Sequence, residues 1–219
     1  RKKSGHPAQS GEQALQHDVT VGGVRHRFEG PIDWFFNATR DRDDIAYTRE
    51  WMWQLNRMSW WRTLAKAYAA TGDPRYARAF ADQLESWVRA CPRPDDLGNY
   101  EDSAWRTIEA GLRMGGSWPT AFLAFLHSAE FTDRHLVLYM KSTFEHAEHL
   151  AAAQRQPRHS NWAMMEMNGL FTAGVLFPEF EHAAEWRRLA MSRLAEEQDR
   201  QFLADGFQYE LTRSEERRV

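Results

Sequence analysis

One stretch of the chain, residues 158–181, limits the folds that are open to it. It reads R-H-S-N-W-A-M-M-E-M-N-G-L-F-T-A-G-V-L-F-P-E-F-E. Its apolar residues cannot all lie on one face of a helix, and a helix that is apolar on every side is a buried one. Ser160-Asn161, Glu166 and Asn168 interrupt this pattern, and polar groups on a buried helix need partners or face a pocket. Two interpretations follow: a core helix capped by Ser160 or Asn161, or a helix whose Asn161 lies at the mouth of a cleft and contacts a ligand.

The remainder of the chain has the periodicity of amphipathic helices. From Thr48 onward apolar residues recur at three- and four-residue steps, and one helix is predicted to run through to Thr71. The segment 71–74, T-G-D-P, ends that helix and caps the next. A helix is expected from Glu101 to Met114, with a break after it at 115–117, G-G-S. A long last helix is expected to open at Pro178 and to end at 205–206, D-G. A Gly-Gly turn within residues 19–28 predicts one small β-hairpin.

These boundaries give an all-α fold of about seven helices with short links, which pack as antiparallel neighbours. An α/α solenoid and an α/α toroid both fit. The lack of a fixed-period repeat counts against a simple solenoid.

Bulk composition excludes several classes of protein. A chain of 219 residues is one domain, or one domain plus a fragment, and a net charge of −3 gives no basic balance for nucleic acid. No apolar run reaches the roughly 18 residues of a membrane span, and no signal peptide is visible behind the first residues. Because the chain lacks an initiator Met, its start is expected to be processed or cut.

No cofactor is expected from the motifs. Nucleotide-binding, nucleophile-elbow and zinc-protease signatures are absent from the sequence. His146 and His149 lie three apart on one expected helix, a spacing more typical of a surface than of a metal site. Cys91 is the single cysteine, so an internal disulfide is excluded.

Candidate binding residues come from polar–aromatic clusters. The chain has ten Trp, which form a large-residue core or flat platforms for sugar rings. Three clusters place Trp beside polar side chains, at residues 51–58, 105–109 and 160–166. Amides, arginines and indoles together would suit an anionic sugar chain, because Arg and amide donors match a carboxylate. The predicted substrate-binding residues are Asn56, Arg57, Trp105, Arg106, Trp162 and Glu166.

The motifs of these clusters occur in a known order. The chain reads R-E-W-M-W-Q-L-N-R-M-S-W-W at 49–61, A-Y-A-A-T-G-D-P-R-Y-A at 67–77 and W-R-T-I-E-A-G-L-R at 105–113. It continues with N-W at 161–162, F-P-E-F at 177–180 and D-G-F-Q-Y-E-L at 205–211. Over roughly residues 30–212 this resembles the N-terminal domain of the heparinase II/III-like polysaccharide lyases, and most of all their heparin-sulfate lyase branch.

The resemblance implies a fold and a location. It implies an incomplete α/α toroid, followed in the family by a C-terminal β-sandwich domain, in a secreted or periplasmic bacterial enzyme. The expected organisation is an N-terminal extension at 1–30, the toroid at 31–212 and a charged tail at 213–219. The chain is expected to be a truncated fragment that lacks the β-sandwich and is inactive alone.

It also implies a reaction, β-elimination in a uronic-acid polymer of the heparin or heparan sulfate type. Neutralising the uronate carboxylate stabilises the developing anion, a base takes the C5 proton and an acid protonates O4. Asn161 occupies the position of the family's carboxylate-neutralising Asn. Glu215-Glu216 stand where the family has the Tyr-His of proton transfer, and Met58 stands where the branch often has His.

Two other classes stay open at this point. A glycoside hydrolase on a similar toroid needs two carboxyl groups across the cleft, and Glu109, Glu166 and Glu210 are available. A non-catalytic helical scaffold would instead bury Trp51, Trp105 and Trp162 and have no groove.

Overall fold

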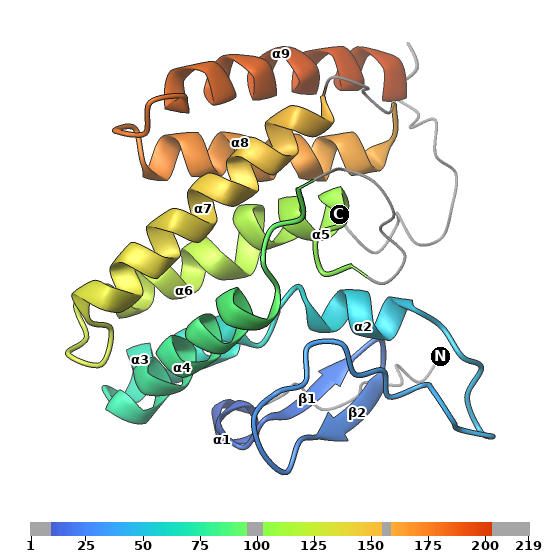
Figure 1. Ribbon diagram of the computed structural model, residues 1–219, viewed down its shortest axis with the longest axis vertical. Coiled ribbons are helices and arrows are strands. Elements are labelled where there is room, and N and C mark those ends of the chain that lie inside the picture. Colours follow the sequence, from blue (N-terminus) through green and yellow to red (C-terminus); the bar gives the residue numbers. More distant parts are fainter. Residues whose placement is uncertain (1–9, 96–102, 155–158, 203–219) are drawn as a thin grey trace.

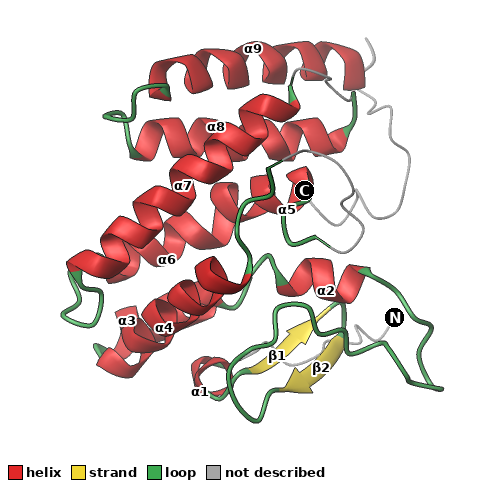
Figure 2. Ribbon diagram, in the orientation of Figure 1, coloured by secondary structure: helices red, strands yellow, loops and turns green. Residues whose placement is uncertain are grey.

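The chain is described here from a computed structural model, which covers residues 10–95, 103–154 and 159–202. Helices dominate these ranges, beside one β-hairpin (Figures 1 and 2). The elements are α1 (Gly11–Leu15), β1 (Asp18–Val21), β2 (Val24–Arg27), α2 (Glu50–Leu55), α3 (Trp61–Thr71), α4 (Pro74–Ala90), α5 (Thr107–Leu112), the π-helix η1 (Arg113–Ser117), α6 (Trp118–Phe125), α7 (Asp133–Ala153), α8 (Asn161–Leu176) and α9 (Ala183–Gln201).

The helices are arranged as successive antiparallel pairs. α3 packs on α4, the continuous unit α5–η1–α6 is followed by α7 running back along it, and α8 packs on α9 (Figure 1). Contacts between pairs run from α3 to α6, from α4 to α7, and from α5 and α7 to α8. The expected all-α, incomplete toroid of helix pairs is confirmed, together with its N-terminal hairpin, in which Asp18 pairs with Arg27 and Val21 with Val24.

Several predicted helix ends are confirmed in detail. Gly72 has φ 68° after α3, in the left-handed region that favours glycine. The Asp73 carboxylate accepts a hydrogen bond from the Arg75 amide at 2.9 Å, and Pro74 is the first residue of α4. Ser160 likewise caps α8, because its hydroxyl accepts from the Trp162 amide at 3.2 Å.

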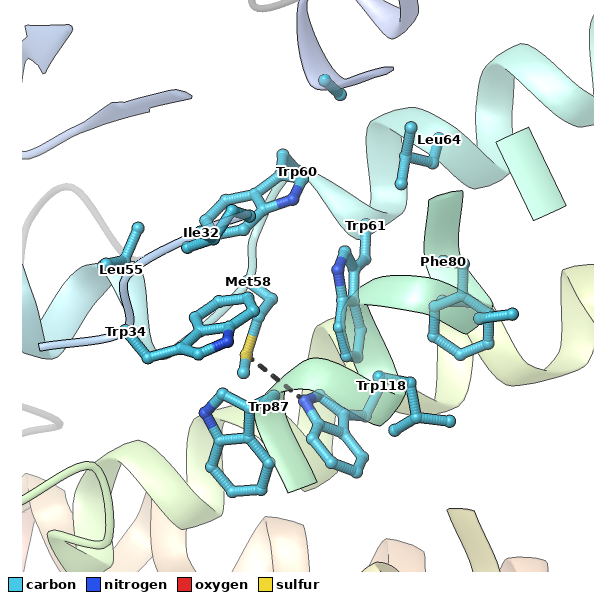
Figure 3. Close-up of a cluster of buried hydrophobic side chains, with 14 of the residues drawn as sticks. Ile32, Trp34, Leu55, Met58, Trp60, Trp61, Leu64, Phe80, Trp87 and Trp118 are labelled. Atoms are coloured by element: carbon cyan, nitrogen blue, oxygen red, sulfur yellow. Dashed lines mark hydrogen bonds between the residues drawn. The ribbon is translucent and has the colours of Figure 1, made fainter. Parts of the chain in front are cut away.

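The single helix expected from Thr48 to Thr71 is wrong, because the chain turns between α2 and α3. Met58, at φ 45°, is in the left-handed region that a residue with a side chain seldom adopts. Its side chain is fully buried among Trp34, Trp60 and Trp118, and the Trp118 indole N–H points at its sulfur at 3.5 Å (Figure 3). The packing of this thioether explains how the strained turn is held.

Three other helix boundaries differ from expectation. The segment 115–117 does not break the chain's helix but continues it as a π-helix into α6, and Gly115 there lies against the Asn168 side chain of α8. The helix expected from Glu101 begins at Thr107, and the last helix begins at Ala183 rather than Pro178. The expected stop at 205–206 lies outside the described residues.

Most of the Trp residues form the core. Eight of them donate an indole hydrogen bond to a protein partner, which is how buried Trp satisfies its N–H. Figure 3 shows several of these rings between α3, α4 and α6. A second apolar cluster, which includes Trp186, joins α5, α7, α8 and α9. The two Trp residues outside this group of eight, Trp53 and Trp162, are only half-buried.

Candidate functional site

The predicted site residues come from three chain segments that the fold brings together. Arg57 follows α2, Arg106 immediately precedes α5, and Asn161 begins α8. α5 and α8 touch through glycines. A Cβ on Gly111 would lie 2.6 Å from the Met165 carbonyl, and one on Gly169 would lie 2.6 Å from the Gly111 carbonyl. This close backbone approach holds the two helix starts near each other.

Arg106 lies against both half-buried Trp rings. Its guanidinium carbon is 3.4 Å from the centroid of the Trp53 ring and 4.8 Å from that of Trp162. A cation at these distances is attracted to the ring faces, and the interaction strengthens when the pair is withdrawn from water, as Arg106 is here. The side chains of α2 and α8 are therefore joined through one arginine.

Glu109 joins the two arginines of the site. Its carboxylate is fully buried, accepts from Arg57 at 2.7 Å and lies 3.4 Å from Arg106 Nε. Arg57 also lies 3.8 Å from the more exposed Glu50. A buried carboxylate between two guanidinium groups fixes both of them, and Arg106 and Glu109 pair at i, i+3 spacing.

Asn161 and Glu166 are both largely buried. Asn161 is the first residue of α8 and only 8% exposed, while Glu166 lies where α8 meets α5 and accepts from Gln154 at 3.5 Å. Trp162, next to Asn161, stays half-buried against Arg106. Asn161 is thus the sequence neighbour of the Trp ring that Arg106 contacts, and little of its surface is in solvent.

The structure places Asn56 and Trp105 in the core. The Asn56 amide donates to the Trp34 carbonyl at 2.8 Å and to the Met52 carbonyl at 3.0 Å, and its oxygen accepts from the Trp87 indole at 2.9 Å. The Trp105 indole donates to the Cys91 carbonyl at 2.9 Å. Both side chains are buried and make hydrogen bonds within the protein. They therefore support the site from the core.

Arg113 supports the same segments from beneath. It is fully buried, and one of its terminal nitrogens donates to the Asn56 carbonyl at 3.0 Å and to the Ala104 carbonyl at 2.8 Å. Ser117, at the other end of the π-helix, donates to the Arg57 carbonyl at 2.6 Å. The π-helix therefore anchors the backbone on which Arg57 and Arg106 stand.

A cavity of about 400 Å³ opens beside Arg57, lined also by the hairpin, the π-helix and α8. Its residues Arg62 and Gln54 were not singled out from the sequence, and neither was Trp53 as a partner of Arg106. The i, i+4 spacing of Trp53 and Arg57 in the helix predicted from Thr48 was the signal that could have marked that face.

Titratable groups near the site are not arranged for a metal. Among the described residues there is no group of three or more His, Cys, Asp or Glu side chains that could hold an ion. His146 and His149, expected on a surface, are instead buried and hydrogen-bonded to the protein. Across those same ranges no helix has the length and apolar character needed to cross a membrane.

The positions of these residues bear on the two alternative functions, the non-catalytic scaffold and the glycoside hydrolase. Trp51 and Trp105 are buried, as a pure scaffold requires, but Trp162 is not. Glu109 is held in ion pairs by two arginines, which leaves no free carboxyl there for a hydrolase. Glu210 and Glu215-Glu216 lie outside the described residues.

Known proteins resemble this chain in sequence and in fold. The chain is 36% identical over 163 residues to a heparin-sulfate lyase from Pedobacter heparinus, a match covering 73% of this chain and 24% of that protein. It is 28% identical to one from Bacteroides thetaiotaomicron, covering 84% of this chain and 25% of the relative. The chain thus spans about a quarter of the length of these relatives.

Solved structures also resemble this chain. The heparan sulfate lyase of Pedobacter heparinus superimposes with a TM-score of 0.76 at 30% identity, covering 97% of this chain and 33% of that one. A heparinase III structure gives 0.77 at 29% identity, covering 92% and 32%. The family model described as "Heparinase II/III N-terminus" matches residues 4–215. The chain therefore belongs to the heparinase II/III family and corresponds to its N-terminal domain.

Proposed function

We propose that this chain is the toroid part of a polysaccharide lyase that cleaves a uronic-acid-containing glycosaminoglycan of the heparin or heparan sulfate type by β-elimination. The family match over residues 4–215 carries the proposal. The proteins it resembles are named heparin-sulfate lyases. The arrangement of Arg57, Arg106 and Trp162 supports the part of the proposal that concerns binding an anionic sugar chain.

Each group has a defined role in this proposal. Trp53 and Trp162 offer indole surface to sugar rings, and Arg106 between them gives that surface a positive charge. Arg57 faces the carboxylates and sulfates of the polymer. The Asn161 amide donates to the uronate carboxylate, and this lowers the cost of the carbanion that forms when the C5 proton leaves. Glu166 lies further along the same helix than Asn161.

The base and the acid are not assigned to this chain. In family members a Tyr-His pair serves the proton transfers, and this sequence has Glu215-Glu216 at that place. We propose that a β-sandwich domain partners the toroid in the working enzyme, in the periplasm or outside the cell. We further propose the division into an extension at 1–30, a toroid at 31–212 and a tail at 213–219.

A chimera tests the proposal. Residues 31–212 of the chain replace the matching segment of the Pedobacter heparin-sulfate lyase, so that this lyase supplies the Tyr-His pair and everything after it. Heparan sulfate cleavage is followed by the ultraviolet absorbance of the unsaturated uronide. We expect turnover with the native sequence and a loss of at least about 100-fold with Asn161→Ala. Ser160→Ala is the matched control, because it removes the helix cap but leaves the amide, so it lowers stability by about 1 kcal/mol and keeps turnover.

Three results would contradict the proposal. No unsaturated product from any uronic-acid polymer removes the lyase function. Saturated products without the chromophore indicate the hydrolase instead. Full turnover in a folded Asn161→Ala chimera removes Asn161 from its role.

A further inference from the structure

We propose that the 400 Å³ cavity beside Arg57 is a subsite for an acidic substituent, a sulfate or a carboxylate, of the bound sugar chain. The cavity is named here the hairpin-side cavity, and its walls include Gln54, Arg57, Arg62, Gly116, Met165 and Asn168. This inference rests on the proposed function, since the ligand is part of the same polymer. The volume is within the ~300–1,000 Å³ usual for ligand sites.

The charge of the hairpin-side cavity has one sign. Arg57 and Arg62 are its charged lining residues, and no Asp or Glu of the described chain lines it. Arg57 shares its charge with Glu109 and Glu50. Arg62, in the first turn of α3, is exposed and makes no ion pair with a described residue. A guanidinium left uncompensated at a concave surface is suited to an anion.

A neutral amide, that of Asn168, also lines the cavity. Asn168 is in the middle of α8, where Asn is a poor helix former, and its side chain makes no hydrogen bond to a described residue. It is exposed and lies over Gly115, whose missing Cβ leaves it room. The polar face that interrupts the apolar α8 thus carries an amide toward the cavity rather than into the core.

The walls are fixed before any ligand arrives. Gln54 accepts from the Gly22 amide at 3.1 Å and donates to Glu50 at 3.1 Å, which ties the hairpin to α2. Ser117 donates to the Arg57 carbonyl at 2.6 Å. The left-handed backbone at Met58 separates Arg57 from the start of α3 and is locked by core packing. A preorganised pocket loses little entropy when it binds.

Space remains at the cavity wall for a bulky group. Apart from the backbone of its own helix and its chain neighbours, no heavy atom lies within 4 Å of the place where a Cβ on Gly116 would be. A side chain introduced there would occupy the volume that the acidic substituent needs, without removing a charge. Gly116→Leu therefore fills part of the cavity, whereas Arg62→Gln removes one of its positive charges.

Calorimetric titration of the full chain with two hexasaccharides of equal length tests the subsite. One is sulfated heparan sulfate, and the other is unsulfated N-acetylheparosan, whose acidic groups are carboxylates alone. We expect Arg62→Gln to weaken binding about tenfold, because one charge-assisted hydrogen bond is lost. We expect Gly116→Leu to weaken binding by a similar factor. Arg188→Gln on α9, exposed and away from the cavity, removes the same charge and is the matched control.

The two ligands identify the substituent. A loss confined to the sulfated hexasaccharide assigns the subsite to sulfate, and an equal loss with both assigns it to a carboxylate. If Arg62→Gln and Gly116→Leu bind both ligands as Arg188→Gln does, the subsite is refuted while the proposed function stands. If the native chain binds neither hexasaccharide, binding of the polymer by this domain fails, and the subsite fails with it.

Discussion

Arg113 donates a hydrogen bond from Nε to Nε2 of His146 over 2.9 Å in the core of the protein. The other ring nitrogen of His146 donates to the Ser142 carbonyl at 2.6 Å, so the imidazole is neutral with its proton on Nδ1. Burial, and then the charge of Arg113, hold the pKa of His146 well below its usual value. Burial lowers the pKa of Arg113 to about 9, so it remains charged at neutral pH.

The protein should lose stability in mild acid. Burial lowers the pKa of His149 from 6.5 to about 4, and His146 shifts in the same direction. Above pH 6.5 these rings are neutral in the folded and in the unfolded protein. Below pH 6.5 the unfolded chain binds protons that the folded chain does not bind. His149 alone then removes about 3 kcal/mol between pH 6.5 and 4. His182, whose pKa is raised by Glu148, acts in the opposite sense.

Urea unfolding at a series of pH values measures this effect. His149→Gln keeps a donor for the Trp105 carbonyl but does not titrate, so its stability should fall less steeply, by about 1.4 kcal/mol per pH unit. His127→Gln makes the same exchange at an exposed histidine and is the matched control. Equal slopes for the native protein and His149→Gln would show that this ring does not resist protonation in the fold.

Asn56 should matter for stability rather than for affinity. Its amide donates to two buried carbonyls, so Asn56→Asp sets a carboxylate against the oxygens of Trp34 and Met52. We expect a loss of about 3 kcal/mol or more in thermal or urea unfolding. Asn168→Asp makes the same change on an exposed site and should stay within about 0.5 kcal/mol. If Asn56 contacted substrate instead, Asn56→Asp would change affinity and leave stability intact.

The contact between α5 and α8 depends on the missing side chain of Gly111. A Cβ there would lie 2.6 Å from the Met165 carbonyl and 2.7 Å from the Glu166 Cα, both backbone atoms that cannot yield without moving α8. Gly111→Ala should therefore cost about 1–3 kcal/mol in urea unfolding. Gly116→Ala, a helical glycine with open space before it, should cost nothing or add stability. Equal stabilities would show that the helices separate easily.

Fold class and several boundaries could be predicted from local chemistry. The cap at residues 72–74 and the start of α8 at Ser160 depend on residues adjacent in sequence, which is why the structure agrees with the prediction there. The turn at Met58 could not be predicted, since a residue with a side chain is held at positive φ only by distant rings. The π-helix likewise lies where Gly115 meets Asn168, a residue more than fifty positions further along the chain, so no local signal marks it.

The candidate site, like the fold, could be predicted from the sequence only in part. A cluster of Trp and polar residues marks the right segments, yet Asn56 and Trp105 lie in the core while Trp53 lies against Arg106. Which member of a helical cluster faces outward depends on what the rest of the fold packs against it. Arg62 carries no local signal, because an exposed arginine on a helix is ordinary until a hairpin closes a cavity beside it.

Arg106 should require its planar guanidinium, beyond its charge. The group lies 3.4 Å from the Trp53 centroid and 4.8 Å from the Trp162 centroid, so it fixes both indole faces. Arg106→Lys keeps the positive charge but cannot stack or pair with Glu109 in the same geometry. We expect the heparan sulfate hexasaccharide to bind about tenfold more weakly, a loss that corresponds to the ~1–2 kcal/mol of a desolvated cation–π contact.

Two controls separate stacking from charge. Arg188→Lys makes the same exchange on the exposed face of α9 and should bind as the native chain does. The defect of Arg106→Lys should persist when salt is raised, because an ammonium and a guanidinium are screened alike while a lost stacking contact is not. Binding by Arg106→Lys equal to that of the native chain at low and high salt would mean that Trp53 and Trp162 hold their positions without this arginine.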